Sequence, residues 1–134
     1  MKLSQQELSS ALRLSWWRKS STTPDLWTPE NRHLGQAAAT SLVIQDVLSC
    51  DIRVRTIVGP VDGARPSPVG EHYVNVYRSN PIDLSDYVLP HGHKLEPNIA
   101  VPHGSERAHL LAKSDVSVAY ESLLNALRVN GIRI

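Results

Sequence analysis

The chain has 134 residues, 41% of them apolar and 20% charged, and a formal net charge of +1. This length predicts a single domain over residues 1–134, and the composition is typical of an ordinary folded protein rather than a disordered one. Its 14 Lys and Arg residues are scattered and are balanced by 13 Asp and Glu residues, which excludes a strong basic surface, so we expect no nucleic-acid partner.

A first helix is predicted to begin near Gln5. Ser4 and Glu7 have the spacing of a capping box, and apolar residues then recur at helical intervals as far as Trp16 or Trp17. Both tryptophans are interpreted as packing residues at the end of this helix. The alternative is that one of them lines a substrate groove.

An irregular segment rich in Ser, Thr and Pro follows, over residues 20–33. Because loops in front of a buried helix often line a binding site, Trp27 and Asn31 are candidate substrate contacts. Packing and helix capping explain these two residues equally well.

The central element is predicted to be a helix over residues 34–48, which is apolar on nearly every face and therefore buried. Its N-terminus offers free backbone N–H groups and the positive end of the helix dipole, an environment that stabilises thiolates and oxyanions. Cysteine hydrolases place their nucleophile at such a position. Here the position holds Ala37.

Residues 51–58 alternate polar and apolar side chains, which predicts a half-buried strand. Cys50 precedes it at the C-terminal end of the central helix, where the helix dipole raises the pKa of a thiol. We therefore interpret Cys50 as structural. The segment 59–70, with its Gly and Pro residues, is predicted to be a long connection.

A second strand is predicted over residues 71–77. Its alternation places His72 on the face shared by Val74 and Val76, and Asn75 on the opposite face. If the valine face packs on the central helix, the His72 imidazole can reach the helix N-terminus, as a general base must. The alternative is a histidine that is hydrogen-bonded for structural reasons.

A turn at residues 78–81 and a short strand at residues 82–84 complete a predicted hairpin that carries His72 and Asp83. Asp83 is the candidate for orienting the imidazole, and Asn75 is a weaker substitute and a further candidate substrate contact. Strand alternation argues against Asp83, because it predicts a side chain facing away from His72 unless a bulge or a curled sheet turns it back.

His91, His93 and His103 lie in a loop rich in Pro and Gly, near Glu96. Their spacing matches no strong zinc signature, so we expect a solvated loop, with neither a metal site nor another cofactor. Ser105 is expected to cap a short helix that reaches Ala112.

A last helix is predicted over residues 115–128 and ends near Gly131. The order of elements predicts an α+β fold with an antiparallel sheet packed on the buried central helix. The polar N-terminus, and the absence of any apolar run near the ~18 residues of a membrane span, lead us to expect a cytoplasmic protein that does not bind membranes.

The chain resembles the YunG family of small bacterial proteins over most of its length. The resemblance is carried by Trp27, Asn31, Leu34-Gly35-Gln36, Leu42-Val43, Gln45-Asp46, His72-Tyr73, Asn75 and Ile82-Asp83-Leu84, and in the C-terminal part by Arg107, Leu110-Leu111, Ser114, Tyr120 and Leu123-Leu124. Two positions depart from the family pattern: Ala37 stands where the family has Cys, and Val74 where a Trp usually follows His-Tyr.

The resemblance implies a papain-like fold, of the NlpC/P60 type, and a Cys-His-Asp hydrolase site. In that reading a thiol at position 37 attacks an amide carbonyl, His72 is the base, and Asp83 holds the imidazole. Gln36 and the backbone N–H of residue 37 are the candidate oxyanion donors. The implied partner is a peptide or protein substrate with an amide carbonyl.

Ala37 leaves three interpretations open. The chain is an engineered Cys-to-Ala variant, a natural pseudoenzyme that binds without cutting, or a structural or partner-binding module in which His72 is incidental. The joint presence of Gln36, His72 and Asp83 favours the engineered variant. The sequence does not distinguish hydrolysis from transglutaminase-like acyl transfer, and it does not indicate an oligomeric state.

Overall fold

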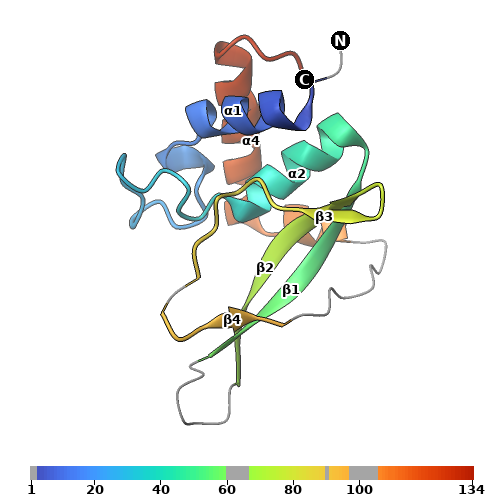
Figure 1. The fold of residues 1–134 in the computed structure, drawn as a ribbon. Coiled ribbons are helices and arrows are strands. Elements are labelled where there is room, and N and C mark those ends of the chain that lie inside the picture. The colour runs from blue at the N-terminus through green and yellow to red at the C-terminus, as the bar shows by residue number, and fades with distance from the viewer. Residues whose placement is uncertain (1–2, 60–66, 90, 97–105) are drawn as a thin grey trace.

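The computed structural model describes residues 3–59, 67–89, 91–96 and 106–134. In chain order the elements are α1 (Gln5–Ser15), the 3-10 turn η1 (Arg18–Ser20), α2 (Ala37–Leu48), β1 (Asp51–Gly59), β2 (Ser67–Tyr77), β3 (Asn80–Ile82), β4 (Lys94–Leu95), α3 (Glu106–Leu111) and α4 (Ser114–Val129). Figure 1 shows the helices grouped at one end of the molecule and the two long strands β1 and β2 extending away from them.

Helix α1 begins with the predicted capping box. The Ser4 hydroxyl accepts a hydrogen bond from the Glu7 N–H, and the Glu7 carboxylate accepts one from the Ser4 N–H, both at 3.1 Å. The helix ends at Ser15, just before Trp16. Trp16 is buried, and its indole N–H donates to the Thr40 hydroxyl at 3.0 Å, so this residue ties α1 to α2.

Helix α2 is the buried centre of the fold, as the sequence predicts. It contacts both α4 and β2, and its residues from Ala38 to Ile44 are all buried. Its hydrophobic residues join those of α1 and α4 in one core. Such a helix is stabilised mainly by burial of apolar surface rather than by helix propensity, because alanine, valine and isoleucine here pack on neighbours from every side.

The sheet has the strand order β3-β2-β1-β4 and is antiparallel throughout. The β1–β2 pairing runs from Asp51↔Val76 to Gly59↔Ser67, with an irregularity between Ile57 and Val58. Strand β2 begins four residues earlier than predicted, at Ser67, and the rest of the expected connection, residues 60–66, lies outside the described part of the chain. Strand β3 ends at Ile82, so Asp83 belongs to the following loop.

The face of β2 that packs on α2 is not the one on which the sequence argument depended. The Asn75 amide, only 1% exposed, donates to the Ser41 carbonyl of α2 at 3.0 Å, and Tyr73 on the same face belongs to the core. The condition that the valine face packs on the helix is therefore wrong. Tyr73 and Asn75 therefore face α2, while Val74 is buried on the opposite face of the strand.

Helix α4 occupies the predicted range. Its buried residues recur at helical spacing: Val116, Ala119, Tyr120, Leu123, Leu124 and Leu127. The short helix α3 occupies the predicted place, although its expected cap, Ser105, lies outside the described residues. Cys50 is buried, and this burial raises the pKa of its thiol, which supports the structural interpretation.

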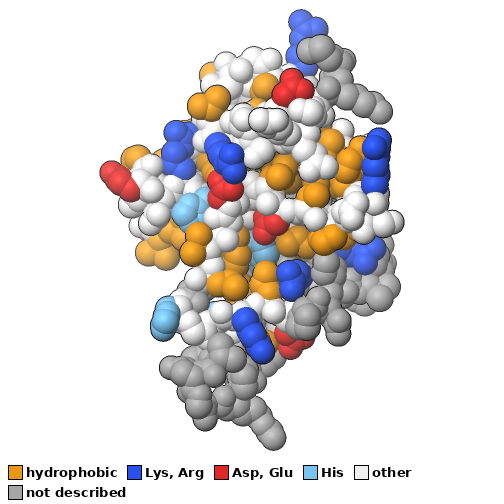
Figure 2. Space-filling model, viewed as in Figure 1, with side chains coloured by type: hydrophobic (Ala, Val, Ile, Leu, Met, Phe, Trp, Pro, Cys, Tyr) orange, Lys and Arg blue, Asp and Glu red, His pale blue; other side chains and the backbone are white. Residues whose placement is uncertain are grey.

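The surface shows mixed charge. On the face drawn in Figure 2, Lys and Arg side chains are scattered among acidic, hydrophobic and uncharged groups. In the part of the chain that the structure describes, no helix combines the length and the apolar character that crossing a bilayer requires.

Candidate functional site

A cavity of about 190 Å³ lies at the N-terminus of α2 and is bounded by four separate segments. The loop before α2 contributes Thr22 and His33, the helix start contributes Gln36 and Ala37, β2 contributes Glu71 and His72, and the loop after β3 contributes Ser85 and Tyr87. Residues far apart in the sequence therefore meet where the helix presents its unpaired N–H groups.

The start of α2 is held in place by hydrogen bonds between the Gln36 side chain and the segment that contains η1. Gln36, the N-cap residue, is fully buried; its side-chain oxygen accepts from the Ser20 hydroxyl at 2.7 Å, and its amide nitrogen donates to the Trp17 carbonyl at 3.1 Å. Since the Gln36 side chain does not cap the helix, the backbone N–H of Ala37 remains the stronger candidate for holding an oxyanion.

Gly35 precedes this turn with a positive φ of 74°. A Cβ atom at this position would lie 2.3 Å from the Ser21 hydroxyl oxygen. Only glycine fits, which explains the Gly-Gln step in front of the helix.

His72 is paired with Asp83, as the family resemblance implies. The imidazole is 2% exposed, and its Nε2 lies 2.6 Å from a carboxylate oxygen of Asp83. Tyr87 stacks on the ring, with centroids 4.2 Å apart and planes inclined by 18°. Because Asp83 accepts from Nε2–H, the neutral ring keeps Nδ1 unprotonated, and no hydrogen bond from the described residues occupies Nδ1. This is the state that a general base requires.

The orientation of Asp83 does not follow strand alternation. Its second carboxylate oxygen accepts from both the backbone N–H of Ser85 at 3.0 Å and the Ser85 hydroxyl at 2.6 Å. The carboxylate therefore lies between two sets of donors, Ser85 and His72. Alternation predicts that Asp83 faces away from His72 unless a bulge or a curled sheet turns it back. Alternation does not apply, because β3 ends at Ile82 and a side-chain-stabilised turn sets the direction of Asp83 instead.

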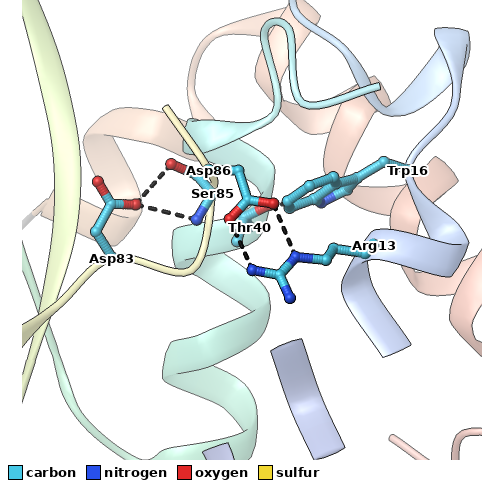
Figure 3. Close-up of polar contacts among 6 residues, drawn as sticks. All are labelled: Arg13, Trp16, Thr40, Asp83, Ser85 and Asp86. Atoms are coloured by element: carbon cyan, nitrogen blue, oxygen red, sulfur yellow. Dashed lines mark hydrogen bonds and ion pairs between the residues drawn. The ribbon is translucent and has the colours of Figure 1, made fainter. Parts of the chain in front are cut away.

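The same loop is attached to α1 one residue further on. Figure 3 shows the Arg13 guanidinium reaching across to Asp86, with Nε–Oδ2 at 2.8 Å and Nη2–Oδ1 at 3.0 Å. Hydrogen bonding to Arg13 lowers the pKa of Asp86. Asp86 itself has a positive φ of 55°, a conformation that few residues other than glycine adopt.

Glu71 and Tyr73 form a second polar pair at this cavity. The Tyr73 hydroxyl donates to the Glu71 carboxylate at 3.2 Å. Burial, followed by the charge of Glu71, raises the pKa of Tyr73 to about 12, so the phenol stays protonated at neutral pH.

The three predicted substrate contacts lie elsewhere. Trp27 donates its indole N–H to the Arg32 carbonyl, Asn31 is exposed in a turn with Thr28, and Asn75 is buried between β2 and α2. None of the three is among the cavity's described lining residues. The contacts of Asn75 give it a structural role, and a substrate role for Trp27 and Asn31 stays a prediction.

Eight of the described lining residues were not among the predicted site residues: Thr22, His33, Gly35, Ala38, Glu71, Tyr73, Ser85 and Tyr87. Thr22 and His33 belong to the segment 20–33 that the sequence indicated as a lining loop, whereas Tyr87 reaches the cavity only through tertiary folding and leaves no local signal. Ser85 could have been found, because an acidic residue two positions before a serine favours a turn in which the carboxylate accepts the serine N–H. Among the histidines of the Pro- and Gly-rich loop, His93 contacts the His91 carbonyl, and His103 lies outside the described residues.

The fold and the site together define a small α+β protein in which a buried His–Asp pair and the N-terminus of a central helix share one cavity. A family model described as "YunG protein" matches residues 4–128, and the chain belongs to the YunG family. No curated protein and no solved structure matches the chain.

The free energy of unfolding is expected to depend on pH through the ionisation of Asp83. Burial alone would raise the pKa of this carboxyl, but hydrogen bonds from His72 and Ser85 outweigh it and lower the pKa. A lowered pKa contributes stability that is present above about pH 4 and is lost as the pH falls through the folded-state value. Since 35% of the side chain is exposed, solvent screening limits this contribution to about 1 kcal/mol or less.

Urea denaturation of the wild-type chain and of Asp83→Asn from pH 3 to pH 7 measures this contribution. The difference in unfolding free energy between the two proteins should be largest near neutral pH and should shrink below about pH 4. A difference that is constant over the whole range would contradict the assigned cause.

Proposed function

We propose that this chain carries the site of a papain-like, NlpC/P60-like cysteine amide hydrolase from which the nucleophile is missing. The observation that supports the proposal most directly is one cavity lined by both Ala37, the first residue of α2, and His72, which is paired with Asp83. A base, its orienting carboxylate and an oxyanion-binding helix end are the components that a thiol at position 37 would need.

With cysteine at position 37 the chemistry follows from these components. Nδ1 of His72 takes the thiol proton, and the thiolate sulfur attacks the amide carbonyl carbon, which places negative charge on the carbonyl oxygen beside the N–H of residue 37. The tetrahedral intermediate then collapses, the C–N bond breaks, and the imidazolium returns its proton to the leaving amine. The acyl group remains on sulfur.

The acyl group then leaves in one of two ways. Attack by water, with His72 as base, releases a carboxylic acid, which is peptidase or deamidase chemistry. Attack by a second amine is transglutaminase-like acyl transfer. The proposed substrate in either case is a peptide or protein amide, and a cavity of about 190 Å³ is small enough to suit an amide group with its adjoining atoms rather than a bulky cofactor. We propose that the protein acts in the bacterial cytoplasm.

The chain as written cannot form an acyl-enzyme, since the alanine methyl group is not a nucleophile. Gln36 and His72 nevertheless line the cavity together with Ala37, and Asp83 is paired with His72. This is the arrangement expected of an engineered Cys-to-Ala variant, which keeps every other site residue.

The second candidate is a natural pseudoenzyme that binds the same class of ligand without cutting it. Ala37 is compatible with this candidate as well, because it lines the cavity and a methyl group leaves room for an amide carbonyl at the helix end. The purely structural alternative predicts that neither the cavity nor His72 contacts any ligand.

Covalent labelling tests the proposal. The variants Ala37→Cys and Ala37→Cys/His72→Ala are treated with a fluorescent peptide chloroacetamide, and the modified residue is located by mass spectrometry. We expect labelling at position 37 that is at least about 100-fold slower without His72. Cys50 serves as the internal control, since it is buried and should stay unmodified. Labelling at position 37 that does not depend on His72 would leave only the binding and structural interpretations.

A further inference from the structure

A second cavity, of about 350 Å³, lies at the other end of α2. It is formed where β1 begins and where the β2–β3 hairpin turns, and its wall includes Ser49, Asp51, Arg53, Tyr77, Arg78 and Ser79. None of these residues belongs to the His72 cavity.

The Arg53 guanidinium in this wall is poorly paired. Its side chain is only 22% exposed, and its Nε is buried without a hydrogen-bond partner among the described residues. Its one described ion pair, from Nη2 to Asp51, is 3.4 Å long, which exceeds the usual range for a good N–H···O bond. A largely buried cation with so few acceptors has unsatisfied donors that an anion can use.

A second cation, Arg78, lies in the same wall. Its guanidinium carbon is 5.0 Å from the Tyr77 ring centroid, and no hydrogen bond from its guanidinium is among the described contacts. Two arginines face one aspartate, Asp51, whose side chain is 62% exposed and is therefore well screened by solvent. The charge of the wall is positive.

The backbone around this cavity is unusual. Within the described residues four non-glycine residues have positive φ, and three of them line this cavity: Ser49 at 54°, Arg78 at 51° and Ser79 at 66°. Two consecutive positive φ values define a hairpin turn that normally favours Asn-Gly. Arg-Ser is a costly choice there, and strained residues of this kind concentrate at functional sites.

Neutralisation of the α2 dipole does not account for these arginines. A cation that serves a helix C-terminus donates to its last carbonyl groups, and no described hydrogen bond joins Arg53 or Arg78 to α2. The helix end contributes about half a negative charge, less than the excess of one positive charge that two arginines leave over Asp51.

We propose that this cavity is a binding site for an oxyanion, either the phosphate or the carboxylate group of a small ligand. Arg53 and Arg78 supply the charge-assisted hydrogen bonds, because guanidinium groups match both kinds of anion in two-point contacts. The hydroxyls of Ser49 and Ser79 supply further donors. The site is independent of the function proposed for the His72 cavity.

The test is an NMR titration of the ¹⁵N-labelled full chain with inorganic phosphate and, separately, with sodium acetate, each at constant ionic strength set with chloride. The signals followed are the Arg53 Nε–H and the backbone amides of Ser49 and Ser79. We expect saturable shifts with at least one of the two anions. Saturation by phosphate alone identifies a phosphate site, and saturation by acetate alone identifies a carboxylate site.

Two variants decide whether the anion binds where we propose. Arg78→Gln removes the positive charge and leaves a shorter polar side chain, and it should weaken binding by about tenfold or more, the loss expected for a hydrogen bond to a charged group. The matched control is Arg55→Gln on β1, the strand that carries Arg53, since the Arg55 guanidinium is engaged by the Glu96 carbonyl outside the cavity, and it should leave the affinity unchanged.

The proposal is overturned by non-saturable shifts with both anions, or by equal affinities for wild type and Arg78→Gln when their amide spectra show the same fold.

Discussion

Amide cleavage by the Ala37→Cys variant is expected to fall by about 10²–10⁴-fold when His72 is also replaced by alanine, because a positioned general base contributes a factor of this size. The new thiol would stand at the first position of α2, where the helix end lowers a thiol pKa below its ordinary value. The value of kcat/KM should therefore rise with pH, and the midpoint of this rise should lie below pH 8.5, the ordinary pKa of a thiol. The measurement is kcat/KM for a fluorogenic peptide amide as a function of pH.

His33 provides the matched control. It is a second histidine in the same cavity wall, but the described contacts do not pair it with Asp83. In the Ala37→Cys background, His33→Ala should change kcat/KM by no more than a few-fold. If His33→Ala rather than His72→Ala abolishes cleavage, the assignment of the base is wrong.

The second large effect is expected from Asp83→Asn in the Ala37→Cys background, with a loss of about 10²–10⁴-fold in kcat/KM. Asp83 satisfies two sets of donors at once: one oxygen faces His72 Nε2, and the other accepts from Ser85. Asparagine has the same shape but only one acceptor oxygen. It must leave either the imidazole N–H or the Ser85 N–H without an acceptor, so the tautomer of His72 that keeps Nδ1 free is no longer favoured.

Asp86, the other aspartate of this loop, provides the control for Asp83→Asn. Asp86→Asn removes a carboxylate from the same loop, but that carboxylate pairs with Arg13 and not with His72. Its effect on kcat/KM should be much smaller than that of Asp83→Asn. NMR of the ring nitrogens reports the His72 tautomer directly, and an unchanged tautomer in Asp83→Asn would contradict the proposed role of Asp83.

The helices could be predicted from sequence because their signals are local. The capping box at Ser4 and Glu7 fixes the start of α1, and the 3.6-residue spacing in α4 selects the residues that are buried there. The pairing of His72 with Asp83 was also predicted, although that step came from the family resemblance and against the alternation argument.

The sheet was harder to predict because alternation says which residues share a face and not which face is covered. Asn75 determines the outcome through its hydrogen bond to Ser41, a contact between segments 34 residues apart. The stacking of Tyr87 on His72 could not be predicted either, because it is also a contact between separate segments of the chain. Tyr87 reaches His72 only because the turn at Asp83 redirects the chain, and no periodic pattern encodes that bend.

The salt link between Arg13 and Asp86 makes the first helix part of the support for a histidine that lies 59 positions further along the chain. The loop is bonded to His72 at Asp83 and to α1 at Asp86, so four residues connect the first helix to the imidazole. A partner that displaced this N-terminal segment would therefore pull on the loop that holds the Asp83 carboxylate against His72.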